Sequence, residues 1–268
     1  MTPGADGSAE ARLRATGLAV PEGHRIVSLA ERPDLVDPSD HFNGGAWPPF
    51  MLESPIANGL FGRCFTDWPD FQFVLLDGAG AIVATNNAMP LAWDGTDEGL
   101  PAGWEDQVVR SVADRDAGRE SNTLGAMQIV VDPKVQGGGY SGTMVGAMRA
   151  AARAAGYRAV IACVRPTWKE RYALIPIERY ARWVRADGLP FDPWIRLHAQ
   201  LGGRIVRPSS RSMTMRGSVA DWERWTGLAM PESGSYVVAR ATSPVHIDRE
   251  RGEGVYHDEN VWMVHDLA

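Results

Sequence analysis

The chain has 268 residues, 44% of them hydrophobic and 22% charged, which suits one large domain around a buried core. The formal net charge of −6, without a long run of one sign, argues against a nucleic-acid partner, because neutralising phosphates needs a basic surface. No apolar stretch approaches membrane-spanning length, and the two distant cysteines, Cys64 and Cys163, favour a reducing cytoplasm over a disulfide framework.

The first half of the chain predicts a flexible start followed by alternating strands and helices. Residues 1–20 are rich in Gly, Ala and Ser and are expected to be flexible. The predicted elements are then a strand (24–29), one or two short helices (38–66), a β-hairpin (71–77 and 81–93), a helix (101–118) and a buried strand (123–131). Asn86 and Asn87 stand in the middle of a strand, where Asn is rare. They mark a bulge or orient a ligand, and the bulge is the preferred interpretation.

The second half predicts one more strand–helix–strand unit and a β-rich end. The predicted elements are a helix (141–155), a buried strand (157–164), an aromatic loop-rich segment (167–191), a helix (194–202), short strands (203–208 and 212–217) and a C-terminal extension (218–268). Asp192 before Pro193 is a helix N-cap signal, and Ser218 with Asp221 forms a capping box. The segment 167–191 is a lid over a ligand or, more commonly for such sequences, a solvated flap with an aromatic inner face.

A glycine loop joins the strand at 123–131 to the helix after it. Gly137 to Gly142 reads GGGYSG, which matches the G-x-G-x-x-G fingerprint of dinucleotide-binding proteins. The NAD interpretation fails because residues 132–136 separate the strand from the first glycine, and no Asp or Glu between Asp132 and Glu170 is available for the ribose. A P-loop is excluded because no Gly-Lys-Ser/Thr is present. A glycine loop at a helix N-terminus still favours a pyrophosphate group.

The same segment, VDPKVQGGGYS from Val131 to Ser141, resembles motif A of the GCN5-related N-acetyltransferases. In that family V-x-P follows a strand, and Q/R-x-x-G-x-G/A opens a helix. Gln136 and Gly139 match, whereas Ser141 stands where Gly or Ala is usual and is expected to be able to cap the helix. The resemblance implies that the loop binds the pyrophosphate of coenzyme A and that a splayed strand pairs with its pantetheine arm. The implied binding residues are Ile129, Val130, Val131, Gln136, Gly137, Gly138, Gly139, Tyr140 and Ser141.

A second similarity lies in the helix at 194–202. The stretch LHAQLGG stands where the family has an apolar residue, Tyr, two variable residues and Leu-Gly-Phe. His198 takes the position of a Tyr that protonates the departing thiolate in many members. An imidazolium could donate that proton, and a neutral imidazole could accept one from an amine. Tyr140 is expected to pack on the loop rather than to do chemistry.

The residues that could act as a general base are less clearly marked. Histone-type members carry a Glu on the strand before the loop, and Gly125 occupies that position, so it can transfer no proton. Glu53, His41 and Asp94 are candidate bases, and each has a structural interpretation as well. Glu53 is retained as a catalytic candidate beside His198 because the 38–66 region borders the acceptor site in the family.

The resemblance implies both a fold and an activity. The fold is a mixed, mostly antiparallel sheet flanked by helices over 21–217, with an insertion at 167–191 and the β-rich extension 218–268 packed on the same domain. The activity is transfer of an acyl group, most often acetyl, from coenzyme A to the amine of a small molecule by direct attack. Two alternatives stay open: an acyltransferase or decarboxylase acting on longer-chain acyl-CoA or carrier-protein thioesters, and a non-catalytic CoA-binding domain.

The remaining expectations concern metals and partners. His246, His257 and His265 lack the tight spacing of a metal site, so no metal is expected. Neither nucleic acid nor a membrane is expected as a partner, and a homodimer is compatible with the sequence.

Overall fold

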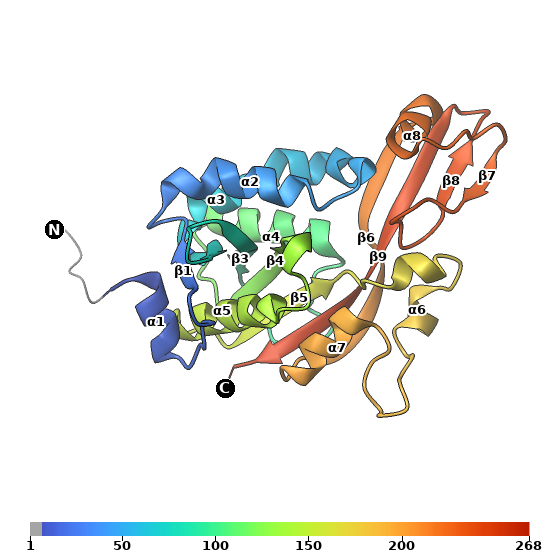
Figure 1. The fold of residues 1–268 in the computed structure, drawn as a ribbon. Helices are drawn as coiled ribbons and strands as arrows, with labels where there is room; N and C mark the ends of the chain where they lie inside the picture. Colours follow the sequence, from blue (N-terminus) through green and yellow to red (C-terminus); the bar gives the residue numbers. More distant parts are fainter. Residues whose placement is uncertain (1–6, 268) are drawn as a thin grey trace.

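The computed structural model describes residues 7–267 and contains one sheet with helices on both faces (Figure 1). The strand order is β1-β2-β3-β4-β5-β9-β8-β7, and β6 pairs with the other edge of β9. The strands are β1 (Arg25–Ser28), β2 (Phe73–Leu76), β3 (Ile82–Leu91), β4 (Thr123–Val131), β5 (Ala159–Val164), β6 (Arg204–Ser218), β7 (Gly234–Tyr236), β8 (Val245–Asp248) and β9 (Glu253–Asp266). The mixed, mostly antiparallel sheet predicted from the sequence is confirmed.

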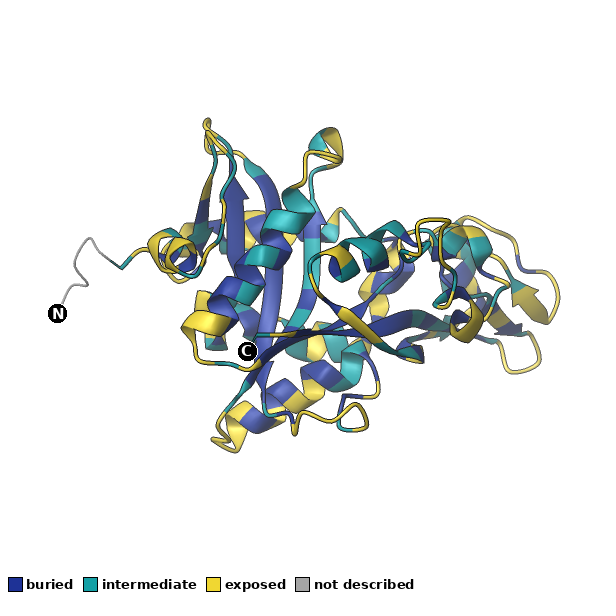
Figure 2. Ribbon diagram, turned by 90° about the horizontal axis from the view of Figure 1, so that it is seen from below, coloured by how far each residue is buried: buried dark blue, intermediate teal, exposed yellow. Residues whose placement is uncertain are grey.

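Helices cover the two faces of this sheet with apolar stripes, so the strands between them are the most buried part of the molecule (Figure 2). The helices are α1 (Ala9–Ala15), α2 (Val36–Gly44), α3 (Arg63–Asp67), α4 (Trp104–Asp116), α5 (Tyr140–Ala154), α6 (Ile177–Tyr180), α7 (Pro193–Gln200) and α8 (Val219–Thr226). Single turns of other helix types are η1 (Pro33–Leu35), η2 (Pro49–Glu53), η3 (Ala57–Phe61), η4 (Pro69–Phe71), η5 (Pro133–Val135) and η6 (Lys169–Tyr172). Among the residues described, no helix combines the length and the apolar character needed to cross a membrane.

Within residues 7–267 one strand pair is parallel, β4 with β5, and this pair creates the opening that positions the site. The two strands pair from Thr123 and Ala159 as far as Ala126 and Ala162, and then diverge although both continue. Beyond Ala126, therefore, the edge of β4 that faces β5 carries no ladder partner within residues 7–267. Backbone groups on such an edge are available to an extended ligand.

A bulge lies in β4 at the start of this divergence. Asn87 of β3 faces Gln128, but Ala88 faces Ala126, so Met127 is an extra residue on β4. The bulge expected near Asn86 and Asn87 is confirmed, with the extra residue on the facing strand.

Helix starts follow the local signals in the sequence. The Asp192 carboxylate accepts the backbone N–H groups of Trp194 and Ile195 at 2.9 and 3.2 Å, which caps α7. Ser218 and Asp221 form the expected capping box of α8.

Two of the predicted segments are wrong. Residues 1–20 are predicted to be flexible, but the segment 9–15 forms α1. Ala9 and Leu13 of this helix are buried in a cluster with α5. Residues 1–6 lie outside the described part. The strands predicted at 203–208 and 212–217 are one strand, β6, whose pairing with β9 shifts register twice. Because the pairing of β6 is irregular in its middle, the sequence pattern there predicts two short strands instead of one long strand.

The β-rich C-terminal part is present and has two components. Strand β9 lies inside the central sheet, with β5 and β8 along one edge and β6 along the other. The segment 219–252, with α8, β7 and β8, is inserted between β6 and β9 at the far end of these long strands (Figure 1). Strand β9 therefore completes the sheet, and segment 219–252 extends from it.

Candidate functional site

A cavity of about 960 Å³ opens where β4 and β5 diverge. Its walls have two parts, which we call the loop end and the polar end. The loop end comprises Ile129, Val130, Val131, Gln136, Gly137, Gly139, Tyr140, Ser141, Leu197 and His198. The polar end comprises Asp40, Asn43, Trp47, Arg165, Glu170, Arg240, Asp258 and Asn260. Of the predicted coenzyme A residues, all except Gly138 line this one cavity.

The loop end presents backbone N–H groups at the start of α5. Gly137 and Gly139 have φ angles of 90° and 81°, in the left-handed region that glycine adopts readily. Gly139 is the N-cap and offers no side-chain cap, and within residues 7–267 the N–H groups of Tyr140 and Ser141 find no acceptor. Ser141 is the second helical residue, so the expected cap by its side chain is absent. The helix dipole and these open donors make the loop suited to an anion.

Tyr140 packs on the loop, as expected. A Cβ at Gly138 would lie 2.6 Å from its ring, so a larger residue at 138 would displace the ring. The Tyr140 ring also lies 5.2 Å from the ring of His24. Tyr140 therefore supports the shape of the loop through packing.

His198 lies in the cavity wall as a neutral residue. It is buried, its Nδ1 is 2.9 Å from Nε2 of His265, and its ring meets Trp194 edge-on at 4.5 Å. Burial, with a smaller contribution from His265, lowers the pKa of His198 to about 3. At neutral pH this low pKa favours the neutral imidazole, the second of the two forms considered for His198, over the imidazolium. A neutral ring N–H can still donate a hydrogen bond.

The candidate bases from the sequence lie elsewhere. Glu53, at the end of η2, is exposed and absent from the cavity wall, whereas its neighbours Met51 and Leu52 line it. His41 and Asp94 are also outside the wall. The structure therefore brings His198 to the loop but does not bring Glu53 to it.

Any larger residue at position 125, acidic ones included, would require the Gln107 side chain to move. A Cβ at this position would lie 2.4 Å from the Gln107 side chain. The absence of a carboxylate on β4 is therefore built into the packing of α4 against the sheet.

The polar end holds charged residues that the sequence did not single out. Asp258 is fully buried and accepts hydrogen bonds from Arg165 Nε at 2.9 Å, Thr242 Oγ1 at 3.0 Å and Tyr256 Oη at 2.5 Å. Its charge is thereby balanced and fixed. In contrast, the carboxylates of Asp40 and Glu170 form no hydrogen bond or ion pair within residues 7–267. Two unpaired carboxylates make this end suited to a cation.

A buried amide network joins the polar end to the bulge in β4. The Asn87 side-chain oxygen accepts from Asn43 at 3.1 Å and from Gln128 at 2.8 Å, and the Gln128 oxygen accepts from the Trp47 indole at 3.0 Å. Asn43, Gln128 and Trp47 line the cavity, but Asn87 does not. Asn87 thus orients cavity residues without facing a ligand itself.

Cys163 is the only cysteine in the cavity wall and is unsuited to nucleophilic catalysis. Burial raises the pKa of its thiol to about 12, and its Sγ lies 3.2 Å from Ser212 Oγ. Since the thiolate is the nucleophile, a neutral thiol does not favour a covalent acyl-cysteine intermediate.

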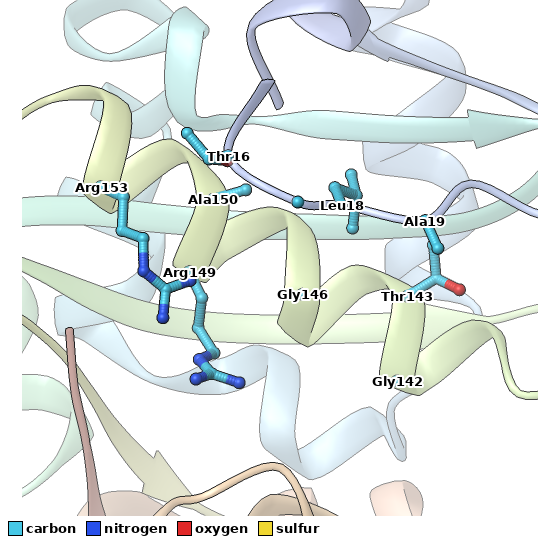
Figure 3. A pocket seen from close by; sticks show the side chains of 10 residues that line it. Thr16, Leu18, Ala19, Gly142, Thr143, Gly146, Arg149, Ala150 and Arg153 are labelled. Carbon is cyan, nitrogen blue, oxygen red and sulfur yellow. The ribbon is translucent and has the colours of Figure 1, made fainter. Parts of the chain in front are cut away.

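A second cavity, of about 300 Å³, lies between residues 16–19 and α5 (Figure 3). Arg149 and Arg153 extend from α5 beside it. The Arg149 guanidinium donates to the carbonyl of Leu201 at 2.7 Å, which ties α5 to the end of α7. This cavity carries neither a carboxylate nor a histidine in its wall, so the larger cavity is the candidate active site.

No protein-family model matches the chain, but a curated relative and solved structures are similar to it. The arginine N-acetyltransferase avaD of Aspergillus versicolor is 30% identical over 288 residues, which cover 95% of this chain and 98% of the relative. Among solved structures, the GphF GNAT-like decarboxylase in complex with isobutyryl-CoA has a TM-score of 0.57 at 21% identity, with 91% of this chain and 100% of that chain covered. The loading GNATL domain of CurA from Lyngbya majuscula has a TM-score of 0.53 at 15% identity, with 91% and 98% covered. The fold, the glycine loop and the sequence relationship agree: the chain belongs to the GCN5-related N-acetyltransferase family.

Proposed function

We propose that this enzyme transfers an acetyl group from acetyl-CoA to a nitrogen of arginine or of a closely related guanidino amino acid. The observation that carries the proposal is a single cavity that joins an uncapped glycine loop to an acidic polar end. The first feature suits the pyrophosphate of coenzyme A, and the second suits a cationic acceptor.

The donor would lie along the loop end. Open backbone N–H groups of the loop, including those of Tyr140 and Ser141, would bind the pyrophosphate, and the open edge of β4 at Ile129–Val131 would pair with the amides of the pantetheine arm. This arrangement directs the thioester along β4 toward the bulge at Met127, where the loop end meets the polar end.

The chemistry would be a direct transfer. The neutral amine of the acceptor attacks the thioester carbon, a C–N bond forms, and the C–S bond breaks as the tetrahedral intermediate collapses. The proton lost by the amine reaches the departing sulfur by way of water or a cavity carboxylate such as Glu170, which gives the amide and free CoA. Neutral His198 would stabilise the departing thiolate by donating a hydrogen bond rather than by giving up a proton.

The acceptor class rests on charge and on the curated relative. Asp40 and Glu170 offer unpaired negative charge to a cation, and the relative is named for arginine. A guanidinium group binds carboxylates in a bidentate geometry, which two carboxylates in one cavity can exploit.

The test is calorimetry with acetyl-CoA and with CoA, followed by thiol-release assays. The amine panel comprises arginine, agmatine, lysine and aromatic amines, and mass spectrometry identifies the product. We expect acetyl-CoA and CoA to bind with micromolar affinity, and we expect the fastest thiol release with arginine. If neither acetyl-CoA nor CoA binds at high micromolar concentration, the proposal is overturned. Rates of thiol release from acyl-CoA esters of increasing chain length test the alternative donors. Faster release from long-chain esters would show that the donor is a long-chain acyl-CoA rather than acetyl-CoA.

A further inference from the structure

Arg240 is the strained residue of the cavity wall. Its φ of 65° is the only positive φ of a residue other than glycine within residues 7–267. An arginine in the left-handed region is held there by its surroundings at an energetic cost, and such residues gather at functional sites. Arg240 is exposed and lines the polar end of the cavity.

Two contacts hold Arg240 in this conformation. Its carbonyl accepts a hydrogen bond from Arg165 Nη2 at 2.6 Å, and Arg165 is itself fixed by the buried carboxylate of Asp258. Its guanidinium donates to the carbonyl of Ala46, in the segment that follows α2. Arg240 therefore connects the inserted segment 219–252 to the α2 side of the cavity.

The charge of Arg240 is left for a ligand. Arg165, the other arginine in the wall, is paired with Asp258, whereas within the described chain no carboxylate pairs with Arg240. A guanidinium has five N–H donors, and the contact with Ala46 uses one of them. The remaining donors suit a carboxylate, which arginine binds through two parallel hydrogen bonds.

We propose that Arg240 binds the α-carboxylate of the acceptor, so that the enzyme selects a free amino acid over the corresponding decarboxylated amine. This inference rests on the proposed function and deepens it. The polar end then matches an amino acid with a cationic side chain: Asp40 and Glu170 provide negative charge for the cation, and Arg240 provides positive charge for the carboxylate.

L-Arginine and agmatine test the inference because they differ only by the carboxylate. Acetyl-CoA-dependent thiol release is measured with both acceptors for the wild type, Arg240→Gln, Arg240→Lys and, as a control, Arg211→Gln, an exposed arginine of β6 outside the cavity wall. We expect Arg240→Gln to lower kcat/KM for arginine on the order of 100-fold and to leave agmatine within about twofold, with Arg240→Lys between them. The affinity for acetyl-CoA, measured by calorimetry, stays unchanged.

Other outcomes separate this inference from the proposed function. If arginine and agmatine lose equal activity in Arg240→Gln, or if arginine loses none, the carboxylate assignment fails while the acyltransferase assignment stands. If the wild type releases no thiol with any amine, the proposed function fails, and the inference that rests on it fails as well.

An Arg240→Gly variant separates recognition from folding. Glycine adopts the left-handed conformation without strain, which offsets the lost contact with Ala46, so the Tm of this variant is expected to stay close to that of the wild type. The loss of preference for arginine over agmatine should nonetheless match that of Arg240→Gln. A glycine variant that keeps the preference would overturn the assignment.

Discussion

We expect the two ends of the cavity to recognise their ligands by different means. In our proposal the loop end binds the pyrophosphate through backbone N–H groups within one continuous run, 136–141, which ends in the first turn of α5. The polar end uses side chains from α2, the end of β5, the inserted segments 167–191 and 219–252, and β9. Backbone recognition tolerates changes of side chain, so it suits a ligand that stays the same while the sequence varies. Side chains on inserted segments can differ between members, so the acceptor specificity is expected to lie there.

The difference also appears in what each end requires of the fold. The loop needs left-handed backbone at Gly137 and Gly139 and little else. The polar end needs a buried ion pair, Asp258 with Arg165, whose charges must leave water. Loop substitutions that keep glycine at 137 and 139 should therefore affect ligand affinity with little effect on stability, whereas those at the ion pair should affect stability first.

The largest expected effect is on stability, from Asp258→Asn. Removing the charge leaves Arg165 without its partner in a largely buried site, and breaking such a pair costs about 3–5 kcal/mol. Denaturant unfolding measures the loss. The control is Asp266→Asn on the same strand, whose ion pair with Arg204 is exposed and is expected to contribute at most about 1 kcal/mol. Equal losses for the two variants would show that the polar end does not depend on this pair.

The next effect is on donor affinity, from Gly139→Glu. The new carboxylate would face the pyrophosphate and should weaken acetyl-CoA binding by about 2–3 kcal/mol, roughly 100-fold, in calorimetry. Gly252→Glu is the matched control, because Gly252 has a φ of 68°, has open space around it and lies outside the cavity wall. Both variants carry similar backbone strain, so only the first should lose affinity. A similar loss in both would mean that the loop does not hold the anion.

The loop end could be predicted from the sequence because its donors are consecutive and its glycines mark the turn. The polar end could not, since Asp40, Arg165, Glu170, Arg240 and Asp258 meet only after the whole sheet has formed. No spacing rule joins residues that lie on five different segments.

Other differences from the sequence prediction have local causes. Glu53 adjoins two residues of the cavity wall but is not part of it, because in the turn η2 its neighbours Met51 and Leu52 line the cavity. The Gly, Ala and Ser content of residues 1–20 predicts a flexible segment, although two local features favour the helix α1. These features are the Ser8 cap and the i,i+4 pair of Glu10 with Arg14. The inserted segment 219–252 looked like a terminal extension because only pairing with β5 reveals that β9 belongs to the central sheet.

A smaller effect concerns pH and the His198–His265 pair. Burial lowers the pKa of His198 to about 3 and that of His265 to about 4. Between these values and the unfolded pKa near 6.5, the unfolded chain binds more protons than the folded one, so stability is full above pH 6.5 and falls as the pH drops. Each histidine contributes at most about 1.4 kcal/mol per pH unit to this slope. Unfolding midpoints from pH 7.5 to 4.5 measure it; His198→Gln should flatten the slope, and the exposed His246→Gln should leave it unchanged.

The smallest effect is expected from Asn87→Ala. Without the Asn87 amide, the side chains of Asn43 and Gln128 lose the hydrogen bonds that orient them in the cavity wall. This loss should weaken acceptor binding by about 1 kcal/mol, which raises the acceptor KM about fivefold. The KM for acetyl-CoA should stay the same, because Asn87 does not reach the loop end. Asn122→Ala removes a structural amide bonded to Trp93 outside the cavity, and there the acceptor KM should not change. A change in the acetyl-CoA KM alone would contradict the division into two ends.

Initial rates with acetyl-CoA and L-arginine varied together test the central claim most directly. If both ligands occupy one cavity and the amine attacks the thioester without a covalent enzyme intermediate, double-reciprocal plots intersect and thiol is released only when both substrates are present. Parallel lines, or thiol release that does not depend on the amine, would contradict direct transfer between the loop end and the polar end.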